Sequence, residues 1–152
     1  MVSSVFRGSM VVHIVLHTRS FPSDGEWEAF VSERAALLDS DGAGSLRGLV
    51  VSDGGAPTSR QRTLYRELSG RVTVPTAQVT SSRLALGIAA AMGWVNPALK
   101  SFAPRHFERA LRYLGVPQEE WPPLGDHLRG ELERLPVDAL FAINTLALRA
   151  AR

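Results

Sequence analysis

The chain has 152 residues, of which 45% are hydrophobic and 21% charged, so its composition is that of a globular domain and excludes a disordered or fibrous chain. The absence of cysteine excludes disulfides, a thiolate nucleophile and cysteine metal ligands. The formal net charge of +2 comes from interspersed basic and acidic residues, a pattern that does not indicate a nucleic-acid partner.

The first predicted element is a β-hairpin. Val2 to Arg7 and Met10 to His17 are β-branched or apolar stretches, and Gly8-Ser9 between them favours a two-residue type II′ turn. The apolar run from Met10 to Leu16 is too short for a membrane span or the core of a signal peptide. We therefore expect a cytoplasmic protein with no integral membrane segment.

The hairpin is followed by a predicted helix and a strand. Ser23 and Glu26 have the spacing of a capping box. The residues of one helical face then recur at the helical spacing: Trp27, Phe30, Val31, Arg34, Leu37 and Leu38. Residues 39 to 45 are polar and predict a loop, and Leu46 to Ser52 predicts a short buried strand.

Two more helices and one strand are predicted in the middle of the chain. Thr58 and Gln61 form a second capping box, which starts a helix that ends at Gly70. Thr76 to Thr80 predicts a strand. Ser81 and Ser82 can cap the next helix, which Gly93 ends.

The last third of the chain predicts a strand followed by helices. Leu99 to Phe102 is the strand, and a helix runs from Pro104 to Leu114. Pro122-Pro123 predicts a break, and two helical stretches meet at Pro136. We expect residues 1 to 116 to form the domain, and residues 117 to 152 a helical extension packed on it or on a partner.

Strands that alternate with helices predict an α/β fold with parallel pairing. We expect a mixed, mostly parallel sheet of about five strands, opened by the hairpin and packed by about four helices. Ligands of such sheets bind beyond the carboxyl ends of the strands. The candidate ligand or partner residues are therefore loop residues and a tryptophan that could line a groove: Ser52, Asp53, Gly54, Gly55, Arg60, Arg62, Arg19, Arg83, Arg105 and Trp94.

The segment from Ser52 to Arg62 is the most informative of these loops. Its two glycines lead into a capped helix, whose free N–H groups and dipole favour an anion. Alternatively, the glycines only form the turn and Thr58 is only a helix cap. The segment does not match a phosphate-binding P-loop or a dinucleotide-binding motif.

No pattern predicts a catalytic residue, a cofactor or a metal site. His13 and His17 are four residues apart, but in a strand this places them about 13 Å apart along one face. His106 and His127 have no acidic residue at ligand spacing within a recognisable motif, so solvent-exposed helix histidines are expected, and the G-x-S-x-G motif is absent. A hydrolase or transferase would need carboxylate, histidine and hydroxyl groups that converge in one cleft.

The order of elements resembles a STAS domain, the fold of anti-sigma-factor antagonists. The motifs resemble those of bacterial STAS-like (SpoIIAA-like) proteins over about residues 1 to 116, in three segments: 22 to 27 (PSDGEW), 51 to 58 (VSDGGAPT) and 94 to 97 (WVNP). In the antagonists, a kinase phosphorylates a serine at the start of the corresponding helix. The resemblance implies Thr58 and Ser59 as the matching switch hydroxyls, although the Asp-Ser-Ser/Thr-Gly pattern of the antagonists is absent.

Two functional hypotheses follow. The first is a non-catalytic regulatory or protein-interaction module. Its binding face comprises the loop from Ser52 to Arg62 and the second helix, and phosphorylation at Thr58 or Ser59 would switch it. The second is a module that binds a small anionic ligand or lipid at the carboxyl ends of the strands, an expectation that the resemblance also implies.

Overall fold

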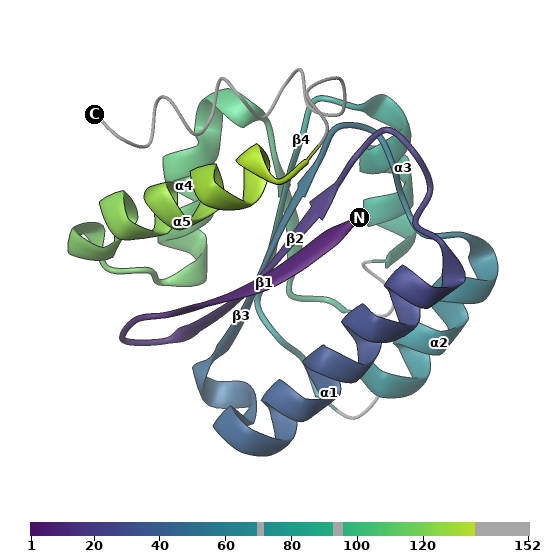
Figure 1. Ribbon diagram of the computed structural model, residues 1–152, viewed down its shortest axis with the longest axis horizontal. Coiled ribbons are helices and arrows are strands. Elements are labelled where there is room, and N and C mark those ends of the chain that lie inside the picture. Colours follow the sequence, from purple (N-terminus) through teal and green to yellow (C-terminus); the bar gives the residue numbers. More distant parts are fainter. Residues whose placement is uncertain (70–71, 93–95, 136–152) are drawn as a thin grey trace.

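The structure is a computed structural model and describes residues 1–69, 72–92 and 96–135. These residues form one five-stranded sheet (Figure 1). Its strands lie in the order β1 (Val2–Arg7), β2 (Val11–His17), β3 (Leu46–Ser52), β4 (Thr76–Thr80) and β5 (Leu99–Phe102). β1 pairs antiparallel with β2, and all other neighbours are parallel. The predicted mixed, mostly parallel sheet opened by a hairpin is thus confirmed.

Helices cover both faces of the sheet (Figure 1). One face carries α1 (Asp24–Ser45), α2 (Ser59–Ser69) and α3 (Arg83–Met92), and the other carries α4 (Phe107–Leu114) and α5 (Trp121–Glu133). The first three helices each connect one parallel strand to its neighbour, and such crossovers share one hand, so these helices fall on one side. After β5, the 3-10 turn Pro104–His106 leads the chain to the opposite face.

Alternate residues of β2 divide between the two helical layers. Val12, Ile14 and Leu16 belong to a core cluster with apolar residues of α4 and α5, among them Leu111 and Leu124. The residues between them point to the other face, because successive side chains of a strand alternate. That second set is His13, Val15 and His17.

The hairpin turn differs from the prediction. Arg7 pairs with Val11, so the loop has three residues and not two. Only Gly42, Gly54 and Gly115 have positive φ among the described glycines, whereas a type II′ turn needs a positive φ at Gly8. The type II′ prediction is therefore wrong.

The predicted loop at residues 39 to 45 is also wrong, because α1 extends to Ser45 with a break at Gly42, whose φ is 72°. The polar residues are tolerated in the helix because Asp39 and Ser40 are exposed to solvent. Asp41 gains a further partner, since Arg7 Nη1 donates to its Oδ1 at 2.8 Å.

The two prolines at positions 122 and 123 begin a helix instead of breaking the chain. They lie in the first turn of α5, where a helix has no use for the backbone N–H that proline lacks. Leu124, Leu128 and Leu132 of α5 join the core cluster under α4. The second half of the predicted extension, residues 136–152, lies outside the described residues, as do the predicted stops at Gly70 and Gly93.

Candidate functional site

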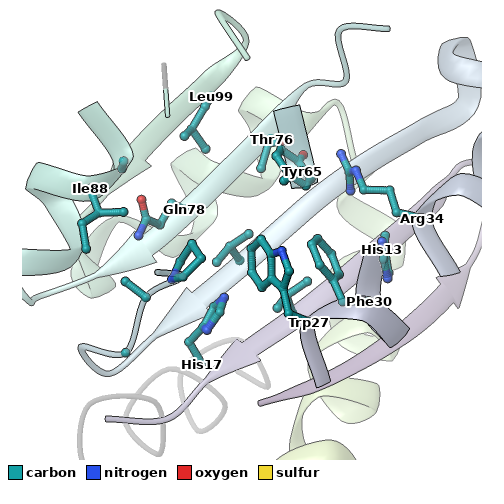
Figure 2. A pocket seen from close by; sticks show the side chains of 16 residues that line it. His13, His17, Trp27, Phe30, Arg34, Tyr65, Thr76, Gln78, Ile88 and Leu99 are labelled. Carbon is teal, nitrogen blue, oxygen red and sulfur yellow. The ribbon is translucent and has the colours of Figure 1, made fainter. Parts of the chain in front are cut away.

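A pocket of about 80 Å³ lies between the sheet and the layer of α1, α2 and α3 (Figure 2). Its lining runs from His17 at the end of β2 to Thr76 and Leu99 at the starts of β4 and β5. The pocket therefore follows the face of the sheet and is not confined to the carboxyl ends of the strands. Most of its wall is apolar or aromatic, which is usual for small-molecule sites.

Three aromatic side chains from two helices form one wall. The ring centroids of Trp27 and Phe30 are 5.1 Å apart, and Phe30 stacks on Tyr65 at 5.9 Å with 14° between the ring planes. Trp27 Nε1 donates to the backbone oxygen of Gln61 at 2.7 Å, which fixes the indole of α1 against α2. Gln61 in turn donates from Nε2 to the backbone oxygen of Pro22 at 2.9 Å. The aromatic wall is thus held in place before any ligand binds.

A buried arginine lines the pocket. Arg34 of α1 is only 3% exposed, and its Nη2 has no hydrogen-bond partner. No salt bridge within the described residues includes Arg34, and its closest aromatic contact places Cζ 5.9 Å from the centroid of the Tyr65 ring. Since a guanidinium does not lose its proton in proteins, a positive charge stays buried there. Buried charges are costly unless they are paired, so this site favours an anion.

Two buried histidines lie on the same face. Burial lowers the pKa of His17 to about 4, and burial, opposed by the hydrogen bond to Glu33, lowers that of His13. His13 Nε2 lies 2.9 Å from Glu33 Oε2, and the ring stacks on Phe30 at 5.3 Å. Near pH 7 both imidazoles are neutral, and a neutral His13 donates from Nε2 to the carboxylate. Nδ1 of each ring is buried without a partner.

The loop from Ser52 to Gly55 is closed by its own hydrogen bonds. Ser52 Oγ donates to the backbone oxygen of Gly55 at 2.8 Å and accepts from Gly54 N at 3.2 Å. A Cβ at Gly55 would collide with the backbone oxygens of Thr18 and Ser20, so this position requires glycine. Of the sequence candidates in the described part of the chain, Gly55 alone lines the pocket.

The candidate arginines do not converge on the pocket. Arg19 Nε donates to Asp53 Oδ2 at 3.0 Å, and Arg60 Nη1 reaches Asp24 Oδ2 at 3.4 Å. Arg83 and Arg105 are exposed at the starts of α3 and of the 3-10 turn. Trp94 lies outside the described residues.

The candidate switch hydroxyls lie at the start of α2. The predicted capping box is confirmed, because Thr58 Oγ1 accepts from Gln61 N at 3.3 Å and Gln61 Oε1 accepts from Thr58 N at 2.9 Å. Ser59 is exposed, and its Oγ accepts from Arg62 Nη2 at 2.8 Å. Arg62 also donates from Nη1 to the backbone oxygen of Pro57 at 2.9 Å. Thr58, Ser59 and Arg62 lie outside the lining of the pocket.

Sequence reasoning missed Arg34, His13 and His17 as site residues. Arg34 stands within the apolar stripe of its helix, where a charged residue is out of pattern, and this was the available signal. The two histidines occupy alternate positions of an apolar strand, which pointed to one buried face. The sequence pattern does not specify which helices pack against these two histidines.

Comparison with known proteins does not identify the function of this site. No family model matches the chain, and searches of curated proteins and of solved structures found no match. No helix in the described ranges is long and apolar enough to cross a membrane. The same residues contain no group of three or more histidine, cysteine or acidic side chains that could hold a metal ion.

Proposed function

We propose that the chain is a non-catalytic module that binds a small anionic ligand in the pocket between the sheet and α1, α2 and α3. The buried guanidinium of Arg34, which forms no salt bridge within the described residues, carries this proposal, because a bound anion would remove the cost of the buried charge. The aromatic wall supports it, since Trp27 and Tyr65 offer apolar surface beside the charge.

The polar groups of the pocket support binding more than catalysis. The described lining contains no carboxylate. The hydroxyl of Thr76 is already used, because it donates to the backbone oxygen of Val74 at 3.0 Å. Hydrolysis or group transfer would need free carboxylate, histidine and hydroxyl groups together, whereas here the carboxylate of Glu33 lies outside the lining against His13, and the hydroxyl of Thr76 is engaged.

Native mass spectrometry of the protein purified from its own host tests this function. Ala89 lines the pocket, whereas Ala90 on the same helix is exposed, so Ala89→Phe fills the pocket and Ala90→Phe is the matched control. We expect a small-molecule mass on the wild type and on Ala90→Phe, and none on Ala89→Phe. A ligand that Ala89→Phe retains in full, or a wild type that carries none and binds no small anion on titration, would contradict the proposal.

A protein-interaction module switched by phosphorylation is the second candidate. The observation that favours it is the exposed hydroxyl of Ser59, which already contacts Arg62 and would as a phosphate gain a charged partner. Phosphorylation there, together with loss of partner binding when Thr58 and Ser59 are both replaced by alanine, would support this role. An unmodified protein whose partner binding survives both replacements would exclude it.

A further inference from the structure

We propose that the ligand is a small carboxylate with a flat apolar body, and that its carboxylate pairs with the guanidinium of Arg34. This inference rests on the proposed ligand-binding function and specifies the ligand's chemistry. Three properties of the pocket lead to it: its net charge, the geometry around Arg34, and the shape of its apolar wall.

The charge of the pocket matches a single negative charge. Arg34 is the one charged side chain in the described lining. Burial keeps His13 and His17 neutral near pH 7 by lowering the pKa of each ring. A carboxylate would balance the charge of the lining side chains, whereas a phosphate dianion would exceed it and leave a buried net negative charge, which is costly. The charge balance therefore favours a carboxylate.

The guanidinium also has the shape that a carboxylate needs. Arginine presents its N–H donors in a planar fork that binds both oxygens of a carboxylate at once. Nη2 is buried and has no hydrogen-bond partner among the described residues. Figure 2 shows the guanidinium end of Arg34 directed toward the side of Tyr65 and Thr76. A carboxylate there would lie beside the Tyr65 ring.

The walls next to Arg34 favour a flat body. Phe30 and Tyr65 stack almost parallel, at 14°, and Trp27 packs against Phe30 (Figure 2). Flat rings gain offset or edge contacts on such walls. The volume of about 80 Å³ holds several water molecules, so the enclosed part of a ligand must be compact.

Two other polar side chains of the lining, Gln78 and Thr76, already have hydrogen-bond partners and would add little. Gln78 Nε2 donates to the backbone oxygen of Ala85 at 3.4 Å, and its Oε1 lies 3.4 Å from Ser101 Oγ. Thr76 Oγ1 accepts from Asn96 Nδ2 at 3.2 Å, besides its bond to Val74. The positive charge that recognises the anion is therefore that of Arg34.

Benzoate and its neutral isostere benzamide test the inference by calorimetric titration of the full chain. We expect the wild type to bind benzoate at least about tenfold more tightly than benzamide, since charge-assisted bonds are about twice as strong as neutral ones. Arg34→Met should abolish this preference and retain binding of benzamide. Arg34→Lys keeps the charge without the fork and should restore part of the preference. Arg66→Met, which removes an exposed arginine of α2, is the control and should behave as the wild type.

The outcomes separate the inference from the proposed function. The carboxylate inference would be wrong if the wild type bound both compounds equally, or if Arg34→Met kept the preference for benzoate. Either result would leave the proposed ligand-binding function unaffected. Inorganic phosphate that binds as tightly as benzoate would also overturn the carboxylate inference. If neither aromatic compound nor phosphate bound, the ligand-binding function would fall, and the inference with it.

Discussion

The two faces of the sheet consist of alternate residues of the same strands, but they bury different types of side chain. The face under α4 and α5 is filled by aliphatic and aromatic side chains such as Leu111, Leu114 and Leu124. The face under α1, α2 and α3 buries His13, His17 and Arg34 around a pocket. Buried polar groups without partners are rare in natural proteins and need an explanation, and the proposed ligand-binding function would supply one for the second face.

The largest expected effect on stability comes from a substitution in the core between the sheet and α4 and α5. Leu111 is 1% exposed, and replacing it by alanine should lower the free energy of unfolding by about 4 kcal/mol, because the lost contacts leave a cavity. The same change at Leu99, which is half-buried and lines the pocket, should cost about 1 kcal/mol, since part of its surface already faces open space. Urea denaturation measures both. If both variants lost the same free energy of unfolding, the two faces would not differ in how tightly they are packed.

The pH dependence of stability tests the buried histidines. The pKa of His17 is about 4 in the folded protein and about 6.5 in the unfolded chain, so between these values the unfolded chain binds more protons. Stability should therefore fall as the pH is lowered from 6.5 to 4, by about 3 kcal/mol for this group. His17→Gln should flatten that part of the profile, measured by urea denaturation at several pH values. An unchanged slope in this variant would show that His17 is not the group responsible.

Removal of the unpaired charge should stabilise the empty protein. Arg34→Met exchanges a buried guanidinium for an apolar side chain of similar length, and we expect a gain of about 1–2 kcal/mol in ligand-free protein. Arg47→Met is the contrast, because Arg47 donates from Nε to the backbone oxygen of Leu114 and from Nη1 to that of Gly44, both at 2.8 Å. It should destabilise by about 1 kcal/mol or more. If Arg34→Met lowered the free energy of unfolding as much as Arg47→Met does, Arg34 would have partners that stabilise its position.

The smallest effect concerns the helices that carry the pocket. Thr58→Ala removes the cap of α2, and Ser23→Ala removes that of α1, so each should cost about 1 kcal/mol by chemical denaturation. Thr58→Ser keeps a hydroxyl and should restore most of the loss at α2. Thr58→Ala with wild-type stability would show that this cap contributes little to the pocket layer.

Local signals explain why most elements could be predicted. The bounds of β3 (Leu46–Ser52), β4 (Thr76–Thr80) and β5 (Leu99–Phe102) match the prediction, since each is a short run of strand-forming residues with a turn or cap beyond it. The two capping boxes likewise lie within four residues of sequence. The helical residues 39–45 were missed because polar residues with glycines are typical of loops. The start of α5 at Trp121 was missed because Pro122-Pro123 was interpreted as a break, although the first turn of a helix accommodates proline.

The site was less predictable than the fold. The loop from Ser52 to Arg62 drew attention because glycines and a cap are visible in sequence, yet it contributes only its short segment 55–57 to the pocket. Arg34 and His17 gain their importance from burial and from missing partners, and both depend on elements distant in sequence. The order of residue types in a sequence does not show which buried polar groups will lack a hydrogen-bond partner.

The two edges of the sheet differ in how they would meet another protein chain. β5 has only four residues, and its exposed Lys100 holds Nζ 4.4 Å from the centroid of the Tyr113 ring. A short edge with a lysine discourages strand addition and aggregation. β1 has six residues and lacks such a lysine, so it is the edge where an extended peptide could extend the sheet. Of the two edges, β1 is therefore the one at which pairing with another extended chain is expected.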